Sequence, residues 1–365
     1  MQFHIFSTKR EPRIGSLIML VIFAWSVKKP RRLLFLVKIF GIFLRALLIR
    51  GVKARRLNGN IPLVLGISPT LRCNYNCQGC YALKSPIQDE LSSAELNGLL
   101  EEAESFGVAS VVVTGGEPFL REDLLLTMEK HRKLLFVVVT NGVFLTPAFA
   151  RRIAQSRNII ILVSVEGFEE ETDARRGKGA YRKALQSMKY LKAEDLLYGF
   201  AATANTANLE ALSSDRFTEE MLNLGCKVGF FTEYIPSGEK PVSNWILNNQ
   251  EREKLRTKVL ELRRKKALVI IQFPHDEYGK HNMCSASGKA FLHINAHGEV
   301  EPCPFAPYSC ENIREGGLRL AFESAFLRAI RNQPHLMRRN TYACALFEHR
   351  DEVGKLHDAI LNSRK

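Results

Sequence analysis

The chain has 365 residues, 46% of them hydrophobic, which is enough to bury one large core or two modest ones and excludes a disordered chain. The formal net charge is +14, but residues 1–56 hold 13 Lys and Arg against one acid, Glu11. This segment therefore carries most of the charge, and the remainder of the chain is close to neutral. A basic nucleic-acid-binding face on the main domain is not expected.

The basic N-terminal segment contains two apolar runs. Residues 14–27 form the first, and the second, residues 33–49, is interrupted by Lys38 and Arg45. Neither run reaches the roughly 20 uncharged residues of a comfortable membrane-spanning helix. Lys and Arg precede the first run, as in a signal peptide, but KKPRR follows it where a small-residue cleavage site would stand. We expect the segment to be retained in the mature chain.

On a helix, Arg31, Lys38 and Arg45 form one narrow basic stripe, because a step of seven residues turns by only about 20°. The other faces are almost wholly apolar and carry Phe35, Phe40 and Phe43. Such a helix suits the interface of an anionic membrane, so we expect peripheral contact through residues 14–56 at the inner, cytoplasmic face. The alternative is a helix that packs on the body of the protein, with its charges at the solvent edge.

From residue 62 onward, short β-rich runs alternate with amphipathic helical segments. The expected strands are residues 63–68, 109–114, 135–140, 159–165, 198–203 and 228–233. The helices expected between them are residues 92–106, 148–155, 181–192 and 218–224. Each strand is a nearly continuous apolar run, which indicates a parallel sheet covered by helices. Because the strands end in polar or glycine-rich residues, we expect an α/β, barrel-like fold with its site at the strand carboxyl ends.

Three of the eight cysteines fall within eight residues, directly after the first expected strand. Cys73, Cys77 and Cys80 have the spacing C-x3-C-x2-C. A chain of this size does not need disulfides, and metal ligation in a reducing compartment fits the spacing better. Three thiolates can bind three irons of a [4Fe–4S] cluster and leave one iron open to a small molecule. Zinc is the alternative, but no fourth Cys or His lies nearby in the sequence.

The triplet resembles the signature of the radical S-adenosylmethionine (SAM) superfamily. Tyr75 and Tyr81 border it, and Gly79 stands where an aromatic residue usually precedes the last cysteine, as is common in the branch that includes peptide maturases. The resemblance implies a partial (β/α)6, TIM-like barrel, which matches the six expected strands. It also implies an enzyme whose [4Fe–4S] cluster reductively cleaves SAM to a 5′-deoxyadenosyl radical, using a low-potential electron donor such as a ferredoxin or flavodoxin.

Residues at the ends of the second and third strands fit the same resemblance. Gly115 and Gly116 let the backbone approach a ligand closely, and Glu117 adds a charge that could meet an ammonium group. In the family, this motif receives the methionine amino group of SAM. Asn141 follows the third strand, where similar proteins commonly face the cofactor, although Thr-Asn-Gly is also the sequence of a simple turn.

The fourth strand ends with Ser164 and Glu166, which alternation sends to one face, where they could hydrogen-bond ribose hydroxyls. Many relatives have Asp in place of Glu166. Arg176 resembles the family arginine that meets the SAM carboxylate, and Arg175 is the competing candidate. A surface salt bridge is the alternative role for both arginines.

Beyond the barrel, the alternation stops after a charged helix at residues 249–266. We therefore divide the chain into a helical segment (1–58), a radical SAM barrel (59–248) and a small cysteine-bearing extension (249–365). Residues 291–301 read as a hairpin that leads to Cys303. Cys226, before the sixth strand, is expected to be a buried apolar residue.

The extension resembles the SPASM or twitch region of peptide-modifying radical enzymes, which holds auxiliary clusters. Its four cysteines, Cys284, Cys303, Cys310 and Cys344, allow one cluster at most. Cys310 lies in a Pro-rich loop, and without it three ligands would leave an open iron. Zinc and simple buried thiols are the alternatives.

Two functional hypotheses follow. The first is a membrane-associated radical SAM enzyme; the cysteine-bearing extension favours a peptide or protein substrate, and the N-terminal segment favours a lipid-linked one. The second is a non-catalytic, membrane-anchored iron–sulfur electron carrier or sensor, in which the strand-end residues have no ligand to bind. RNA modification, which the superfamily also performs, is disfavoured by the near-neutral body.

Overall fold

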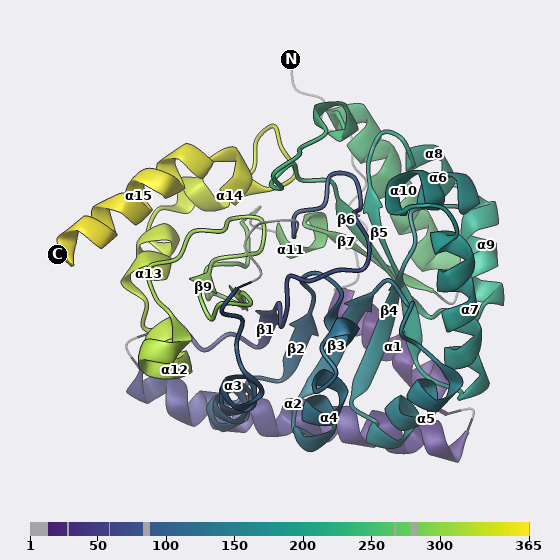
Figure 1. The fold of residues 1–365 in the computed structure, drawn as a ribbon, viewed down its shortest axis with the longest axis horizontal. Coiled ribbons are helices and arrows are strands. Elements are labelled where there is room, and N and C mark those ends of the chain that lie inside the picture. The colour runs from purple at the N-terminus through teal and green to yellow at the C-terminus, as the bar shows by residue number, and fades with distance from the viewer. Residues whose placement is uncertain are drawn as a thin grey trace.

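The fold is organised by one curled sheet, seen from the side in Figure 1. The computed structural model describes residues 14–27, 29–57, 59–82, 88–265, 268–278 and 283–364. In these ranges nine strands lie in the order β7-β6-β5-β4-β3-β2-β1-β8-β9. The first 13 residues, which belong to the expected N-terminal segment, lie outside the described residues.

Six strands occupy the positions expected from the sequence, and each pairs in parallel with the next. They are β1 (Val64–Ile67), β2 (Ser110–Val113), β3 (Leu135–Thr140), β4 (Ile159–Ser164), β5 (Tyr198–Ala204) and β6 (Val228–Glu233). The predicted α/β, partial-barrel fold is confirmed. Parallel pairing brings all six carboxyl ends to one edge of the sheet, so residues far apart in sequence meet there.

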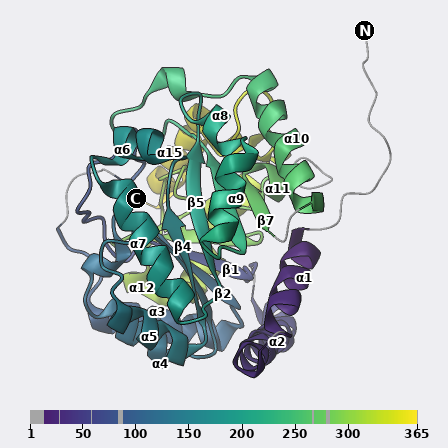
Figure 2. The same ribbon diagram turned by 90° about the vertical axis from the view of Figure 1, so that its right-hand side faces the viewer.

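Helices cover the outer face of the sheet in Figures 1 and 2. They are α3 (Ser93–Phe106), α4 (Leu124–Lys130), α5 (Pro147–Ser156), α6 (Glu169–Arg176), α7 (Ala180–Ala193), α8 (Leu209–Leu212), α9 (Asp215–Asn223) and α10 (Asn249–Lys265). Local sequence sets several starts: Ser92 and Glu95 form a capping box on α3, and Thr146 and Ser214 cap α5 and α9. The main core lies between these helices and the sheet.

Three further strands extend the sheet beyond the six that the sequence predicts. β7 (Val269–Phe273) pairs in parallel with β6, and β8 (Phe291–Ile294) pairs in parallel with β1. β9 (Val300–Glu301) pairs with β8 in the expected hairpin. The sequence analysis missed β7 as a parallel strand because the charged helix α10 masks the continuing strand–helix alternation. The chain thus passes from one edge of the sheet to the other through α11 (His275–Tyr278).

The C-terminal segment ends in short helices beside β8 and β9 (Figure 1). They are α12 (Ile313–Phe322), α13 (Ala325–Arg331), α14 (Ala345–Glu348) and α15 (Arg350–Ser363). Phe106 on α3 packs edge-on against Phe322, with ring centroids 5.3 Å apart. These helices share the main hydrophobic core with the barrel. The boundary at residue 248 stays a prediction.

The two N-terminal helices lie across the amino ends of the strands, along the lower edge of Figure 1 and at one side of Figure 2. They are α1 (Ile14–Ser26) and α2 (Pro30–Lys53). Ile22, Phe35 and Ile39 form a hydrophobic cluster with Leu135 and Ile160, near the starts of β3 and β4. This cluster fixes both helices to the bottom of the barrel.

Polar contacts hold α2 in the same place. Arg32 forms an ion pair with Asp195 and lies 4.7 Å from the centre of the Trp25 ring. Lys38 donates to the carbonyl of Ser156 at 2.6 Å, and Arg45 donates to that of Glu104 at 3.1 Å. These carbonyls lie at or near the carboxyl ends of α5 and α3, where the helix dipole favours a cation. Part of the basic stripe therefore faces the body of the protein.

The helix α2 has two apolar faces. One is buried against the barrel through Phe35, Ile39, Ile42 and Ala46. The opposite face is exposed and carries Leu33, Val37, Phe40, Leu44, Leu47 and Leu48. The structure thus shows α2 packed on the body of the protein, and the opposite face of α2 remains an exposed apolar surface. Within the described ranges, no helix combines the length and apolar character needed to cross a membrane.

We expect Ile39→Ala to lower the free energy of unfolding by about 2 to 5 kcal/mol, because it leaves a cavity beneath α2. Phe40→Ala is the matched control: Phe40 is 60% exposed, whereas Ile39 is 1% exposed. It should change the free energy by less than about 0.5 kcal/mol. Urea unfolding followed by circular dichroism and tryptophan fluorescence measures both. Equal losses for the two variants would contradict the packing described here.

Candidate active site

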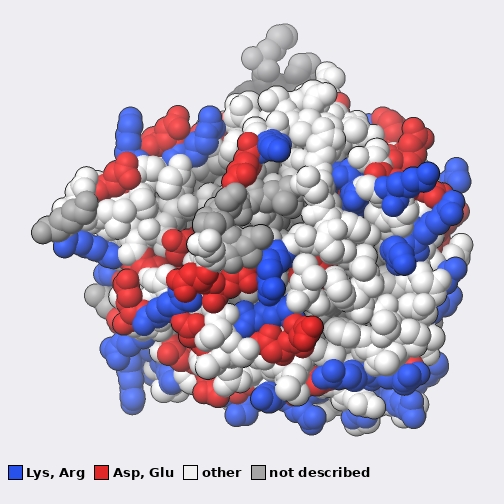
Figure 3. Space-filling model, in the orientation of Figure 1, with Lys and Arg blue, Asp and Glu red and all other residues white. Residues whose placement is uncertain are grey.

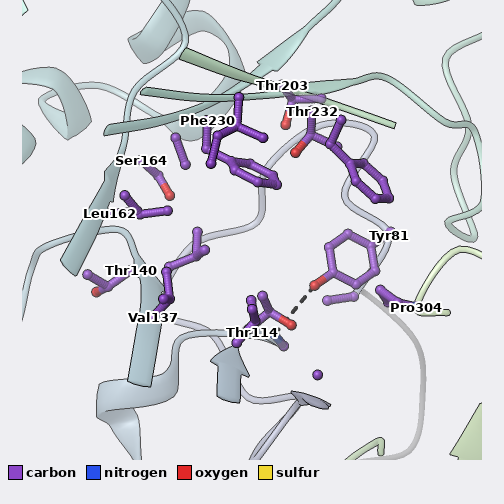
Figure 4. A pocket seen from close by; sticks show the side chains of 18 of the residues that line it. Tyr81, Thr114, Val137, Thr140, Leu162, Ser164, Thr203, Phe230, Thr232 and Pro304 are labelled. Atoms are coloured by element: carbon purple, nitrogen blue, oxygen red, sulfur yellow. Dashed lines mark hydrogen bonds between the residues drawn. The ribbon is translucent and has the colours of Figure 1, made fainter. Parts of the chain in front are cut away.

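A cavity of about 590 Å³ lies inside the curled sheet. Inward-pointing side chains of the parallel strands form its wall, as Figure 4 shows for Val137, Leu162, Ser164 and Phe230. At the strand carboxyl ends it is lined by the residues that the sequence singled out. These are Cys73, Cys77, Cys80, Gly115, Gly116, Glu117, Asn141, Ser164, Arg175 and Arg176.

The three cysteines lie in the loop after β1. Cys77 is buried, and Cys73 and Cys80 are partly buried. The backbone N–H of Tyr75 donates to Sγ of Cys73 at 3.4 Å, and that of Cys80 donates to the carbonyl of Cys77 at 3.3 Å. Burial raises the pKa of Cys73 to about 11 and also raises that of Cys77, so metal binding there must release protons. No three His, Cys, Asp or Glu side chains of the described ranges converge where one metal ion would sit.

Backbone hydrogen bonds from Gly116 and Glu117 hold the start of the cysteine loop against the end of β2. The N–H of Gly116 donates to the carbonyl of Thr70 at 2.9 Å, and that of Glu117 donates to Arg72 at 2.8 Å. A Cβ atom on Gly116 would lie only 2.1 Å from the carbonyl oxygen of Arg72. Glycine is therefore required by the loop backbone as well as by the cavity that it lines.

Glu117 is fixed in the cavity wall by three hydrogen bonds. Its Oε1 accepts from Oγ1 of Thr140 at 2.7 Å and from the N–H of Phe119 at 3.1 Å, and Oε2 accepts from the N–H of Asn141 at 2.8 Å. Burial nevertheless raises the pKa of this carboxyl group. The side chain of Asn141 donates to Asn74 at 2.7 Å, inside the cysteine loop. The turn after β3 thus supports that loop directly.

Glu166 contacts both candidate arginines. Its Oε1 accepts from Arg175 at 2.5 Å and from Nε of Arg176 at 2.7 Å, and its Oε2 accepts from the N–H of Thr203 at 2.9 Å. The two arginines hold the pKa of Glu166 below its ordinary value although burial acts against them. Glu166 is only 1% exposed and, unlike Ser164, is not among the residues that line the cavity.

Arg175 and Arg176 both line the cavity, and Arg175 also hydrogen-bonds with the cysteine loop. Its carbonyl accepts from the N–H of Gln78 at 3.1 Å, and its Nε donates to the Gln78 carbonyl at 3.3 Å. Gln78 lies between Cys77 and Cys80. In the described part of the chain, Arg176 forms no hydrogen bond with that loop; its charge partly offsets the rise that burial causes in the pKa of Cys77 and of Tyr75. Arg176 is therefore the better placed of the two to meet a ligand carboxylate.

Aromatic residues from distant segments complete the site, and the sequence analysis did not find them. Gly79 has a left-handed φ of 63°, and a Cβ there would lie 2.9 Å from the Tyr234 hydroxyl and 3.1 Å from Trp245. The Tyr81 hydroxyl accepts from the backbone N–H of Gly115 at 3.5 Å, and the Tyr81 ring lies 5.2 Å from that of Phe305. Gly79 stands where an aromatic residue usually precedes the last cysteine. Tyr234 and Trp245 lie close to that position instead, and no local sequence motif identifies them.

Three of the four C-terminal cysteines lie near enough for the charge of one thiolate to act on another. Cys284, Cys303 and Cys344 are buried, and burial raises the pKa of each thiol, with Cys344 and Cys284 adding to the shift at Cys303. The partly buried carboxyl group of Glu277 accepts from the hydroxyl of Ser285 at 3.1 Å, raises the pKa of Cys284 through its charge, and lines the cavity together with Cys303.

The other two cysteines have different surroundings. Sγ of Cys310 lies 3.8 Å from the carbonyl oxygen of His357 on α15, and Glu311 and Arg364 are the charged groups that act on it. Cys226 is fully buried, with its Sγ 4.0 Å from Sδ of Met188. The expectation of a buried apolar Cys226 is confirmed.

Grouped thiols, a fixed carboxylate and a guanidinium around one cavity fit a thiolate-bound cluster with a zwitterionic ligand. Residues 67–203 match the family description of the radical SAM superfamily. The matched segment is a radical SAM domain, and the protein is a radical SAM enzyme whose cofactors are a [4Fe–4S] cluster and SAM.

Individual relatives and solved structures agree with this assignment. The chain is 25% identical over 291 residues to the AdoMet-dependent heme synthase of Methanosarcina barkeri, covering 73% of this chain and 83% of that protein. It is also 25% identical to the sporulation killing factor maturation protein SkfB of Bacillus subtilis, covering 72% of this chain and 66% of SkfB. Crystal structures of Streptococcus suis SuiB bound to SAM or to the precursor peptide SuiA share the fold. Their TM-scores are 0.64 and 0.62 and their identities 18% and 17%, over 77% of this chain and 70% of SuiB.

Glu166→Gln should lower the free energy of unfolding by about 3 to 5 kcal/mol, because it leaves two buried guanidinium groups without their anion. Chemical denaturation measures this, and iron content after anaerobic reconstitution should fall in parallel, since Arg175 holds the cysteine loop. Glu169→Gln is the matched control, because Glu169 pairs with Arg182 on the surface. A Glu166→Gln protein as stable as this control would refute the structural role.

Proposed function

We propose that Cys73, Cys77 and Cys80 bind the SAM-cleaving cluster, and that SAM itself lies against the strand ends. The residues proposed for SAM are Gly115, Gly116, Glu117, Asn141, Ser164 and Arg176, with Glu166 and Arg175 as positioning residues. The observation that carries this proposal is that the three thiols and these six residues line one cavity.

The residues of the chain have defined tasks in this proposal. When bound, the cluster and SAM supply a 5′-deoxyadenosyl radical, which takes a hydrogen atom from the substrate or adds to it. Glu117 is held rigidly enough to accept hydrogen bonds from the amino group of SAM. Arg176, charged and anchored by Glu166, pairs with the SAM carboxylate. The largely apolar wall excludes water and other quenchers.

A peptide or protein is the first candidate substrate. SkfB is named as a maturation protein, and SuiB has been crystallised with its precursor peptide. A relative of equal identity, the heme synthase, is named for a product that is not a peptide. A lipid-linked substrate is the second candidate, and the apolar outer surface of α1 and α2 favours it. A ferredoxin or flavodoxin is the electron donor that we propose.

Cys284, Cys303 and Cys344 are proposed to hold an auxiliary iron–sulfur cluster next to the cavity. Their burial and mutual proximity support this. Cys310 was a fourth candidate from the sequence, but its contacts with α15 favour a structural role. The partly buried Glu277 carboxyl group, which accepts from Ser285 next to Cys284 in the chain, is the better fourth candidate in the described residues.

The enzyme, reconstituted anaerobically and reduced, should convert SAM to methionine and 5′-deoxyadenosine. The variant with Cys73, Cys77 and Cys80 all changed to Ala should form none, because the cluster has lost its ligands. Liquid chromatography with mass detection measures the products. A fully loaded, reducible wild-type protein that yields no 5′-deoxyadenosine would instead support the carrier or sensor hypothesis.

The same triple variant separates the two cluster sites. It should retain the iron of the auxiliary site, and adding Cys344→Ala should remove that iron, whereas adding Cys310→Ala should not. Iron counting and electron paramagnetic resonance provide the measurement. Loss of all iron from the triple variant would contradict an auxiliary cluster.

Peripheral contact with an anionic membrane is proposed for the outer surface of α1 and α2. Of the twelve large apolar side chains that are exposed in the described residues, ten lie on these two helices, and Val27 directly follows α1; Leu126 lies elsewhere. Residues 14–57 contain ten Lys and Arg and no acid; Arg32, Lys38 and Arg45 contact the body of the protein, whereas Arg31, Arg55 and Arg56 are exposed. Figure 3 shows basic side chains gathered along the lower edge of the molecule, over α2. An apolar face with a basic rim complements an anionic bilayer.

The protein should sediment with vesicles that contain about one quarter phosphatidylglycerol, and high salt should weaken this binding. Phe40→Asp combined with Leu44→Asp should reduce binding about tenfold or more, since both side chains lie on the exposed face. Leu126→Asp, equally exposed but on α4, is the control and should bind as the wild type does. Equal binding by all three proteins would rule out this surface.

A further inference from the structure

The cavity extends well below the proposed SAM site, toward the amino ends of the strands. Its floor is formed by Ile22, Ile39 and Phe43 from α1 and α2. Leu135, Ile160 and Leu197, at the lower ends of β3 to β5, also line it. A TIM-type barrel normally fills this space with its own side chains. Here the two N-terminal helices close the bottom while the interior above them stays hollow.

The wall changes from apolar to polar along each strand. In β4 the inward residues run from Ile160 through Leu162 to Ser164, and in β6 from Val228 through Phe230 to Thr232. Figure 4 shows Thr140, Ser164, Thr203 and Thr232 as a polar level of the cavity, with Val137, Leu162 and Phe230 among the apolar residues that border it. The polar level lies at the carboxyl ends, where SAM is proposed to bind, and the apolar level lies beneath it.

Among the described residues, the lower part of the cavity offers no charged side chain to a peptide backbone or a charged head group. The charged lining residues, Glu117, Arg175, Arg176, Glu233 and Glu277, all lie at or beyond the carboxyl ends of the strands. Low on the wall, Ser110 is already satisfied, because its hydroxyl donates to the carbonyl of Leu135 at 3.0 Å. A polar ligand placed here would lose its hydrogen bonds with water and gain none in return.

We propose that the lower cavity binds a hydrocarbon chain, acyl or isoprenoid, that belongs to the substrate. This inference rests on the proposed function, because it places the substrate in the same barrel as SAM. The chain would lie between Val137, Leu162 and Phe230 and end against Ile39 and Phe43. The carbon that reacts would then lie on the chain or at its point of attachment, at the level where the wall becomes polar. A membrane lipid and a lipid-modified peptide are two sources of such a chain.

The test measures binding to the reconstituted, unreduced holoenzyme, so that it does not depend on SAM cleavage. The probe is 11-(dansylamino)undecanoic acid, displaced by straight-chain carboxylic acids of about 8 to 18 carbons. Affinity should rise about fourfold for each added methylene until the chain fills the cavity, and should then level off. Affinity that is independent of chain length would overturn the proposal. So would displacement by an iron porphyrin in the absence of any chain-length dependence.

Two substitutions should change the acyl-chain length at which the affinity stops rising, one toward shorter chains and the other toward longer chains. Val137→Phe fills the cavity and should weaken binding of the longest chains at least tenfold, whereas Phe230→Ala should move the plateau to longer chains. Leu126→Phe, on the outer surface, is the control. If Val137→Phe does not fold, Phe230→Ala decides the question, and an unchanged plateau in that variant refutes the site.

Further measurements identify the source of the hydrocarbon chain and test SAM cleavage independently of chain binding. Lysophosphatidylcholine and an acylated dipeptide, each carrying the longest chain that binds, distinguish a lipid from a lipid-modified peptide. Formation of 5′-deoxyadenosine by the same preparation tests the proposed function separately. Intact SAM cleavage without chain binding would refute this inference alone.

Discussion

One buried carboxylate determines how the active site is assembled. Glu166, at the end of β4, is shielded from solvent and is stabilised by Arg175 and Arg176 on α6 and by the N–H of Thr203 on β5. Removing such a charge from water is costly, so the carboxylate needs both guanidinium groups. Their positions in turn serve the site, because Arg175 grips the cysteine loop at Gln78 and Arg176 borders the cavity. The ion pairs of Glu166 therefore connect β4, β5, α6 and the proposed cluster loop.

Around this anchor the barrel separates two chemical environments. At the carboxyl ends of the strands, thiols, a fixed carboxylate and hydroxyl groups line the cavity, whereas apolar side chains line the part below. The proposed radical chemistry belongs at the junction, where water is excluded but a zwitterionic cofactor can still be bound. The floor consists of helices whose opposite face is also apolar. One segment therefore both closes the cavity and presents a surface suited to a bilayer.

The C-terminal segment completes the barrel rather than standing apart from it. It adds β7 beside β6 at one edge of the sheet, and β8 and β9 beside β1 at the other. Phe305 packs on Tyr81, next to Cys80, and on Phe273 of β7, with ring centroids 5.2 and 5.8 Å apart. Cys303 also borders the cavity. A second cluster held there would lie near the substrate, which is consistent with a role in electron transfer.

The sequence by itself determined six strands and the order of their helices, since apolar runs and capping residues are local signals. It also determined the cysteine triplet and the strand-end residues, because parallel strands bring their carboxyl ends together. Only the tertiary structure decided that Glu166 takes Arg175 and Arg176 as partners, that Tyr234 and Trp245 fill the space at Gly79, and that Cys310 lies apart. It alone decided that α2 packs on the barrel and keeps an exposed apolar face. These outcomes depend on contacts between residues far apart in the chain, for which no local pattern exists.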